Sequence, residues 1–353
     1  MTTPIALFDQ NWILGFAEPE LASLFTVDAD LYEMQHFEAE LAKAEAAEGL
    51  IPADAAAAIA DICRSFICDK EGLRQGFGRD GLVVPDFVRQ LKQQVAEPFQ
   101  PYVHFGTTSQ DLIDTSLLLR LQRAAVLIDA GLARLIASFD GLATVHGARE
   151  MMGRTRMQRA RPVSLADKIA TWRDPLLRHR QRLVEMMPRV FVVQLGGAVG
   201  NRREFGEKGQ AIADRLADAL GLARASTARH AERDGMVEAA NWLVLVAGSL
   251  GKFGQDIAIL AMNEVGDVRF SGGGMSSAMT GKSNPVKAEL LVTLARFSAT
   301  LVAGMTQSLV HENERSGAAW SLEWLLLPQM AVAASASVNL AEQLLASLDF
   351  SGS

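Results

Sequence analysis

Apolar residues recur at three-to-four spacing along most of the chain, which is the pattern of amphipathic helices. In the segment DLYEMQHFEAELAKAEAAEGLI, Leu31, Met34, Phe37 and Leu41 follow this spacing, and Gly49 marks its end. No alternating pattern typical of strands stands out, so we predict an all-α fold. Further helices are expected over residues 54–66, 111–150, 163–190, 203–222, 236–265, 287–311 and 320–348.

Two of these segments, Trp242–Met262 and Leu290–Leu309, are apolar on nearly every side. A helix of this kind in a soluble protein must be surrounded by other protein. One chain of this size has few places to enclose several such helices. We therefore expect an oligomer built around a shared helical bundle; the alternative is a large monomeric bundle.

Composition narrows the class of protein. The chain has 353 residues, of which 49% are hydrophobic and 21% charged, so it can bury a sizeable core and disorder is not expected. A formal net charge of −7 argues against a general nucleic-acid binder. The start MTTPIALFDQNW lacks the features of a signal peptide, and no window reaches the roughly 18 uninterrupted apolar residues of a membrane helix.

Cofactor motifs are also missing from the sequence. Cys63 and Cys68 match no disulfide framework or zinc pattern, which favours reduced core residues in a cytoplasmic protein. The six histidines are scattered without ligand spacing. Neither a phosphate loop nor a dinucleotide fingerprint occurs. We therefore expect no metal, no cofactor, no nucleic acid and no membrane among the partners.

The stretch SGGGMSSAMTGKSNPVKAE joins loose backbone to hydroxyl and cationic groups. Its three consecutive glycines leave the backbone free to open and close. Ser276 and Ser277 follow, and a serine becomes a useful base only where donors stabilise its alkoxide. Lys282 and Asn284 supply such donors, so the stretch suits binding a carboxylate while a proton moves beside it. The alternative is a surface linker, in which Gly and Ser are common.

Two other irregular stretches carry anion-binding groups. HFGTTSQD places Thr107, Thr108 and Ser109 just before a helix expected to begin near Asp111, which favours an anion site; simple N-capping is the alternative. Five arginines fall between Arg149 and Arg161, and the guanidinium fork suits carboxylate or sulfonate oxygens. A solvated charged face is the alternative for most of them, and we expect two at most to contact a ligand.

These three loops, in this order in a helical chain, resemble the fumarase/aspartase superfamily from about Asp9 to Leu348. The superfamily signature Gly-Ser-Ser-x-Met-Pro-x-Lys-x-Asn-Pro is matched by MSSAMTGKSNP, with Met275 in place of Gly and Thr280 in place of Pro. HFGTTSQDLIDT is similar to the first superfamily motif, and GRTRMQ is similar to the second. Within the superfamily, HENERSGAAWSLEWLLLP, QLGGAVG and HAERD most resemble the 3-carboxy-cis,cis-muconate cycloisomerases.

The resemblance implies an architecture. It implies long helices, with an N-terminal helical domain over residues 1–110 and a central bundle over residues 111–348 that carries the signature loop. It also implies a cytoplasmic homotetramer in which each active site takes loops from three subunits. Family members commonly continue past position 348 into a small helical domain, which we expect to be truncated or absent here.

The resemblance also implies an activity and its residues. The activity is closure of 3-carboxy-cis,cis-muconate, or of an analogue such as a sulfomuconate, to its muconolactone in protocatechuate-type aromatic catabolism, without a cofactor. Ser276 delivers the proton to carbon, while Lys282, Asn284 and the donors of Thr108 and Ser109 stabilise the enolate-like charge. The matched catalytic set is Ser276, Ser277, Lys282, Asn284 and Glu289. The matched substrate-binding set is His104, Thr108, Ser109, Gln110, Arg154, Thr155, Arg156, Gln158 and Arg315.

Arg156 occupies the position at which the lyases of the superfamily usually carry a histidine. That histidine helps a poor leaving group with its protons, whereas a carboxylate, whose ordinary pKa is near ~4, departs without protonation. Arg156 therefore favours a cycloisomerase over a fumarate-eliminating lyase, and it either pairs with Glu289 or faces the substrate. The remaining alternatives are such a lyase and a non-catalytic helical scaffold.

Overall fold

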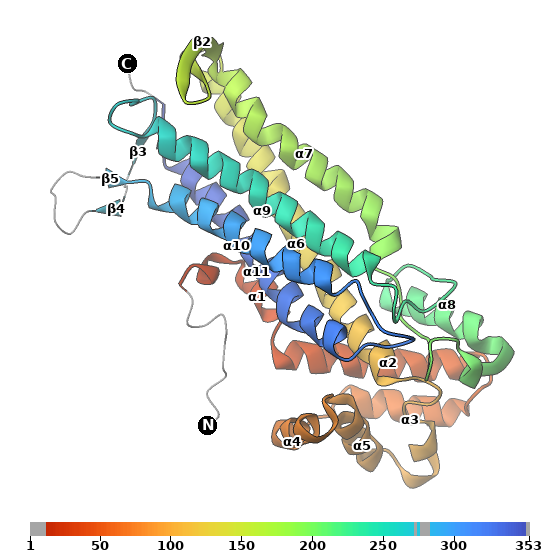
Figure 1. Cartoon of the computed structure of the whole chain (residues 1–353). Helices are drawn as coiled ribbons and strands as arrows, with labels where there is room; N and C mark the ends of the chain where they lie inside the picture. The colour runs from red at the N-terminus through yellow and green to blue at the C-terminus, as the bar shows by residue number, and fades with distance from the viewer. Residues whose placement is uncertain (1–11, 272–273, 276–282, 351–353) are drawn as a thin grey trace.

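A computed structural model describes residues 12–271, 274–275 and 283–350, and helices make up most of this part of the chain (Figure 1). The prediction of a helical fold is confirmed. Ser276, Ser277 and Lys282 lie outside the described residues. The α-helices are α1 (Pro19–Ser23), α2 (Val27–Ala47), α3 (Ala53–Cys63), α4 (Lys70–Asp80), α5 (Val84–Gln94), α6 (Ser109–His146), α7 (Leu165–Val190), α8 (Gly209–Leu220), α9 (Asp234–Leu260), α10 (Val286–Gln307) and α11 (Ala318–Ala346).

Five long helices, α6, α7, α9, α10 and α11, form the central bundle and run along its length (Figure 1). Small residues let them approach closely. On α9, a Cβ at Gly251 would lie 2.4 Å from the Cβ of Ala295, and one at Gly254 would lie 2.5 Å from the carbonyl oxygen of Ala288. Glycine is therefore required where α9 crosses α10. The buried Ala331–Ala334 run has the same effect on α11.

Helices α2 to α5 and α8 pack at one end of this bundle (Figure 1). Here α2 contacts α3, α6 and α8, and Thr26 caps its first turn. Helices α4 and α5 were missed by the sequence-based prediction. The first has three glycines within 11 residues, which weakens the helical pattern, and the second is an 11-residue helix with a proline in its first turn. The 3₁₀ helices are Leu14–Phe16, Glu97–Tyr102 and Arg203–Lys208.

The arginine-rich stretch is a β-hairpin, so its prediction as an irregular loop is wrong. Strand β1 (Glu150–Thr155) pairs antiparallel with β2 (Gln158–Ser164). The two-residue turn places Arg156 at φ 48° and Met157 at φ 66°, the left-handed pair that a tight hairpin needs. Polar residues at most hairpin positions hid the strand pattern. The other short strands are β3 (Arg269–Phe270) with β6 (Leu348–Asp349), and β4 (Gly274–Met275) with β5 (Ser283–Asn284).

Helices α9, α10 and α11 are long and apolar enough to cross a membrane by length and composition. In the fold they pack against one another, and α9 contacts both of the others. Only 28% of the most apolar window of α10 is buried, against 50% for α9 and 67% for α11. The outward side of α10 carries polar residues, including Glu289, Thr293 and Arg296, between its apolar ones.

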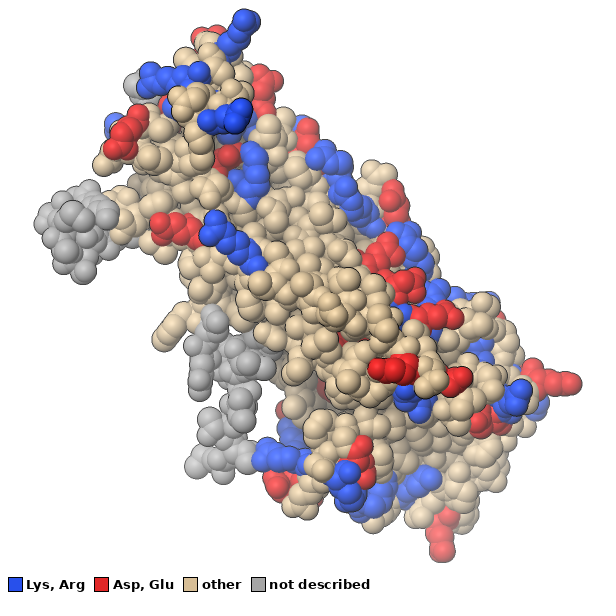
Figure 2. Space-filling model, viewed as in Figure 1, with Lys and Arg blue, Asp and Glu red and all other residues tan. Residues whose placement is uncertain are grey.

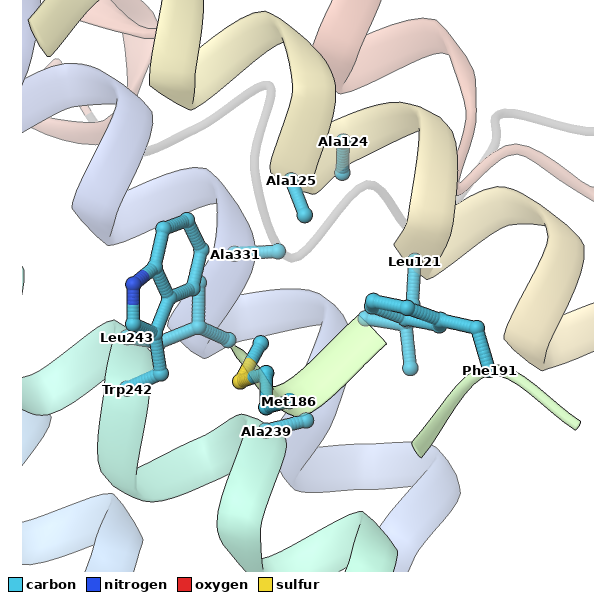
Figure 3. Close-up of a pocket in the computed structure, with 9 residues that line it drawn as sticks. All are labelled: Leu121, Ala124, Ala125, Met186, Phe191, Ala239, Trp242, Leu243 and Ala331. Carbon is cyan, nitrogen blue, oxygen red and sulfur yellow. The ribbon is translucent and has the colours of Figure 1, made fainter. Parts of the chain in front are cut away.

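A small cavity lies inside the bundle between α6, α7, α9 and α11 (Figure 3). Its one side-chain N–H, Nε1 of Trp242, donates to the carbonyl of His179 at 2.9 Å. The cavity therefore offers no group that recognises a charged ligand, and none of the predicted site residues lines it. The lining residues are Leu121, Ala124, Ala125, Met186, Phe191, Ala239, Trp242, Leu243 and Ala331.

Candidate active site

The first predicted motif lies at the amino-terminal end of α6. Thr108 is the N-cap residue, and it forms a reciprocal capping box with Asp111. The helix begins at Ser109, two residues earlier than expected. Capping thus explains Thr108, whereas the Ser109 hydroxyl has no hydrogen-bond partner in the described chain. The N–H groups of this first turn lack partners within the helix, so they favour an anion.

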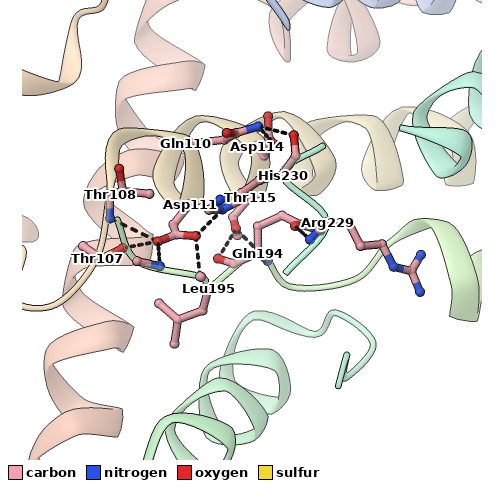
Figure 4. Close-up of polar contacts among 12 residues, drawn as sticks. Thr107, Thr108, Gln110, Asp111, Asp114, Thr115, Gln194, Leu195, Arg229 and His230 are labelled. Carbon is pink, nitrogen blue, oxygen red and sulfur yellow. Dashed lines mark hydrogen bonds and ion pairs between the residues drawn. The ribbon is translucent and has the colours of Figure 1, made fainter. Parts of the chain in front are cut away.

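Asp111 connects this turn to two distant loops (Figure 4). Its side chain is fully buried. Burial alone would raise its pKa, but the bond from His230 and those from backbone N–H groups outweigh burial and hold the pKa below its ordinary value. Five donors reach its two oxygens: the Thr107 hydroxyl (2.9 Å), Thr108 N–H (3.0 Å), Gly196 N–H (2.6 Å), Gly197 N–H (2.9 Å) and His230 Nε2 (2.7 Å).

Gln110 joins the α6 terminus to Arg315. Nε of Arg315 donates to Oε1 of Gln110 at 2.9 Å, and its Nη2 donates to the carbonyl of Ala198 at 3.1 Å. No ion pair to Arg315 occurs within the described residues. Its charge therefore remains available beside the helix terminus. We call Thr107, Thr108, Ser109, Gln110 and Arg315 the donor cluster. The carboxylate of Glu204 lies next to Gly197, and its negative charge disfavours an anion bound nearby.

A buried network of ion pairs lies next to the donor cluster and holds it in place. Arg233 donates to Asp114 at 2.7 Å and pairs with Glu323 at 2.5 Å. Burial alone would lower the pKa of Arg233, but Asp114 and Glu323 outweigh it and raise the pKa. Nε1 of Trp320 also donates to Asp114, at 2.8 Å, and His311 lies 3.6 Å from Glu323. Since Gln110 donates to Asp114 as well, at 3.2 Å, the network holds the loop around Arg315 against α6.

His104, predicted to bind substrate, is engaged inside the chain. Its Nδ1 lies 2.5 Å from Oε1 of Glu38, a buried residue of α2. Glu45, on the same helix, is fully buried, and neither carboxyl oxygen has a hydrogen-bond partner in the described chain. Burial, with a smaller effect of Glu38, raises the pKa of Glu45 to about 9. Glu45 therefore stays protonated at neutral pH.

The hairpin carries the second predicted motif. Arg154 is tied to Asp267 by a 2.9 Å ion pair and also donates to the carbonyl of Met152. Arg156, Arg159 and Arg161 are exposed and have no ion pair within the described residues. Thr155 and Gln158 are paired across the turn and are exposed too. Figure 2 shows Lys and Arg side chains gathered at this end of the molecule.

The third motif is described only at its ends. Asn284 pairs with Gly274 in the β4–β5 ladder, and Pro285 is the N-cap residue of α10. Glu289 is exposed in the first turn of α10. No ion pair joins Arg156 to Glu289 within the described residues of the single chain.

The fold keeps these motifs apart. The donor cluster and the hairpin lie at opposite ends of α6, whose 38 residues span about 57 Å at 1.5 Å per residue. Asn284 and Arg315 lie beyond opposite ends of α10, whose 22 residues span about 33 Å. Figure 1 shows the hairpin and the β4–β5 pair towards one end of the bundle, away from the α6 terminus. A single chain therefore does not bring the three motifs together.

Several residues of the site were missed by the sequence-based prediction. Asp111, Asp114, Arg233 and Glu323 organise the donor cluster, yet none was assigned a role. Asp111 and Asp114 lie one helical turn apart, and the segment HAERD places a histidine and an arginine three positions apart. Both patterns can be read from the sequence. The groups that bind these side chains, however, are about 80 to 210 residues away along the chain. Among the described residues, no group of three or more His, Cys, Asp or Glu side chains is placed to hold a metal.

Comparison with known proteins places these motifs in a family. Residues 21–298 match the family model described as Lyase. The chain is 38% identical over 340 residues to a 3-carboxy-cis,cis-muconate cycloisomerase of Pseudomonas aeruginosa, covering 95% of this chain and 74% of that one. It is 35% identical to a nitrosuccinate lyase of Streptomyces davaonensis, covering 98% of this chain and 72% of that one.

A solved structure shares the fold as well. The crystal structure of the 3-carboxy-cis,cis-muconate lactonizing enzyme from Pseudomonas putida superposes with a TM-score of 0.90 at 37% sequence identity. The match covers 96% of this chain and 77% of that one. The likeness therefore extends over the whole central bundle and is not confined to the motifs.

Proposed function

Since the chain belongs to the lyase family of the fumarase/aspartase superfamily, we propose that it is a cycloisomerase. Its substrate is 3-carboxy-cis,cis-muconate or a close analogue such as a sulfomuconate, and its product is the muconolactone of protocatechuate-type aromatic catabolism. The similarity to several cycloisomerases supports this reaction class. The donor cluster supports a polyanionic substrate, because it combines a helix terminus with a guanidinium that lacks an ion pair in the described chain.

The proposed reaction is an isomerisation that needs only one proton. A substrate carboxylate oxygen forms a bond to a carbon of the conjugated diene, and the electron pair of that double bond moves to the neighbouring carboxylate as an enolate-like dianion. Donors of the cluster, with Lys282 and Asn284, stabilise this charge. Ser276 then delivers a proton to the adjacent carbon; in reverse, its alkoxide removes that proton. The Ser276 alkoxide that remains regains a proton from water, so bonds and charges balance and the reaction as proposed requires no cofactor.

Arg156 favours lactonisation over elimination. It stands at the hairpin tip, exposed and without an ion pair in the described chain, where the lyases of the superfamily usually carry histidine. A guanidinium stays protonated and cannot shuttle a proton to a leaving group. It can still bind an anionic group of the substrate. Lactonisation tolerates that exchange, since its leaving group in the reverse direction is a carboxylate.

A panel of carboxy-, sulfo- and unsubstituted muconates tests this proposal. We expect loss of the diene ultraviolet absorbance with the first or second compound, and Ser276→Ala should abolish turnover while substrate still binds. Ser271→Ala is the matched control. Ser271 lies in the same stretch but outside the proposed catalytic set, and its hydroxyl donates to the Ser347 carbonyl. Retained activity in Ser276→Ala would remove that serine from its role. Turnover of none of the muconates would refute the function.

Elimination is the second candidate, because a nitrosuccinate lyase is among the relatives. Ultraviolet spectra separate the two reactions: lactonisation consumes a conjugated diene, whereas elimination from a succinyl compound creates fumarate. Arg156→His is informative here as well. A shift in preference between carboxy- and sulfo-muconate indicates contact with the substrate, and unchanged kinetics indicate a structural role.

The working assembly is proposed to be a cytoplasmic homotetramer whose active sites combine loops of three subunits. The separation of the motifs in one chain supports shared sites, and the mostly uncharged area over α9 and α10 supports a shared bundle (Figure 2). Apolar side chains are exposed on these helices and on α11: Leu245, Val286 and Leu325 are 44%, 42% and 57% exposed. Burying them between subunits is favourable.

Mixing two variants that are each expected to lose activity tests whether the sites are shared. Thr108→Val and Arg156→Ser alter motifs at opposite ends of α6. If each site takes these motifs from different chains, refolding the two variants together restores part of the activity, because some sites receive two intact motifs. The control pair Arg156→Ser and Gln158→Ala alters one hairpin, so no site is repaired. Activity that stays absent in the first mixture contradicts shared sites, and light scattering reports the number of subunits.

A further inference from the structure

His230 is a buried histidine in which one ring nitrogen forms a hydrogen bond and the other has no partner in the described chain. Only 3% of the residue is exposed. Its Nε2 lies 2.7 Å from Oδ1 of Asp111, and an ionised carboxylate only accepts hydrogen bonds, so Nε2 carries the hydrogen. Nδ1 has no hydrogen-bond partner in the described chain. Among the polar side chains of the described residues, Asp111 alone therefore orients the ring.

Glycines of the 194–200 loop pack directly against this ring. A Cβ at Gly196 would lie 2.8 Å from Cε1 of His230, and one at Gly200 would lie 3.5 Å from Nδ1. The same loop donates the Gly196 and Gly197 N–H groups to Asp111 and accepts a hydrogen bond from Arg315 at Ala198. A change at the ring is therefore transmitted through Asp111 to Thr107 and Thr108, and through the glycine loop to Arg315.

We propose that His230 is a positioning residue for the cycloisomerase reaction: through Asp111 it sets the geometry of Thr107 and Thr108, and through the glycine loop it sets the position of Arg315. This inference rests on the proposed function, since it names which groups hold the substrate-binding donors in place. Asp111 accepts hydrogen bonds from four backbone or hydroxyl donors besides His230. Loss of the histidine should therefore change the orientation of the carboxylate without freeing it. Its effect should appear in substrate binding more than in folding.

Two substitutions separate positioning from packing. In His230→Gln the amide N–H lies near the place of Nε2 and reaches Asp111. In His230→Asn the shorter side chain does not reach it. His179→Gln is the control: His179 is also 3% exposed, but its Nε2 lies 2.8 Å from the Ser249 hydroxyl, in a different network.

Steady-state kinetics on the muconate panel form the first readout. We expect His230→Asn to raise KM by about tenfold to a hundredfold, the size of effect of losing a hydrogen bond to a charged group, with a smaller change in kcat because binding of substrate and transition state weakens alike. His230→Gln should recover most of this loss. His179→Gln should lower the melting temperature and keep the KM of the wild type. The inference is overturned if His230→Asn also changes only the melting temperature, or if Gln is no better than Asn.

Calorimetric binding of citrate, a tricarboxylate probe, forms the second readout and needs no turnover. If the wild type turns over no muconate, the proposed function fails, while citrate still tests His230. Weaker citrate binding in His230→Asn than in His230→Gln then supports the positioning role. Equal affinity in both variants, or no citrate binding by the wild type, overturns it.

Discussion

The two ends of the central bundle are organised in opposite ways. At the amino-terminal end of α6, buried side chains from three segments far apart in the sequence, and the backbone of the Gly196 loop, bind one another through Asp111 and Arg233. At the other end, the hairpin presents Arg156, Arg159 and Arg161 to solvent without an ion pair in the described chain. The first end is preorganised by its own chain. The second leaves its charged groups on the surface of the single chain.

This difference separates two kinds of functional residue. A group inside a closed network has a fixed position, and its replacement affects folding as well as function. A group on an exposed hairpin contributes little to folding, so its replacement affects function alone. Changes in stability should therefore be largest in the buried network and smallest on the hairpin.

The largest effect is expected from Arg233→Met. Removing the guanidinium leaves Asp114 and Glu323 buried without a countercharge, which costs about 3–5 kcal/mol of unfolding free energy. Urea unfolding followed by circular dichroism measures it. The triple variant Asp114→Asn, Arg233→Met, Glu323→Gln should regain part of the loss, because no charge is then left unpaired. A loss below about 1 kcal/mol in the single variant would contradict the buried network.

An intermediate and pH-dependent effect is expected from Glu45→Gln. The folded protein holds the Glu45 proton up to a pKa of about 9, whereas the unfolded chain releases it near 4.5. The contribution to stability is therefore full below pH 4.5 and is lost as pH rises towards 9, by roughly 1.4 kcal/mol per pH unit. Glutamine does not titrate, so the variant should gain stability relative to the wild type between pH 5 and pH 7. Urea unfolding at several pH values measures this, and a difference that does not change with pH would argue against it.

The smallest change in stability is expected at the hairpin. Arg156→Ser and Arg159→Ser remove exposed charges without partners in the described chain, so the unfolding free energy should change by less than about 0.5 kcal/mol. Activity on muconates should nevertheless fall in Arg156→Ser, if the hairpin completes a site. Arg154→Ser is the comparison within the hairpin, because it also breaks the ion pair to Asp267. A large loss of stability in Arg156→Ser would show that the hairpin is part of the folding core.

The helices followed from hydrophobic periodicity because a long amphipathic segment has few alternatives. The ends of α2, α10 and α11 lie within a few residues of the expected positions. Prediction failed where the local signal was weak: in α4, with its glycines, and in the β1–β2 hairpin, whose polar residues hide the pairing. The motifs at Thr108, Arg156 and Asn284 were found because their residue types are unusual together, and no contact was needed to find them.

The sequence by itself determined the helical class, the three motifs and the substitution of arginine at position 156, because these depend on local spacing and residue chemistry. Only the tertiary structure decided that five donors converge on Asp111, that Arg233 lies between two buried carboxylates, and that α6 holds two of the motifs about 57 Å apart. The physical reason is that periodicity reports which face of a helix is buried. It does not report which distant side chain meets that face, and that partner is what gives a buried polar group its role.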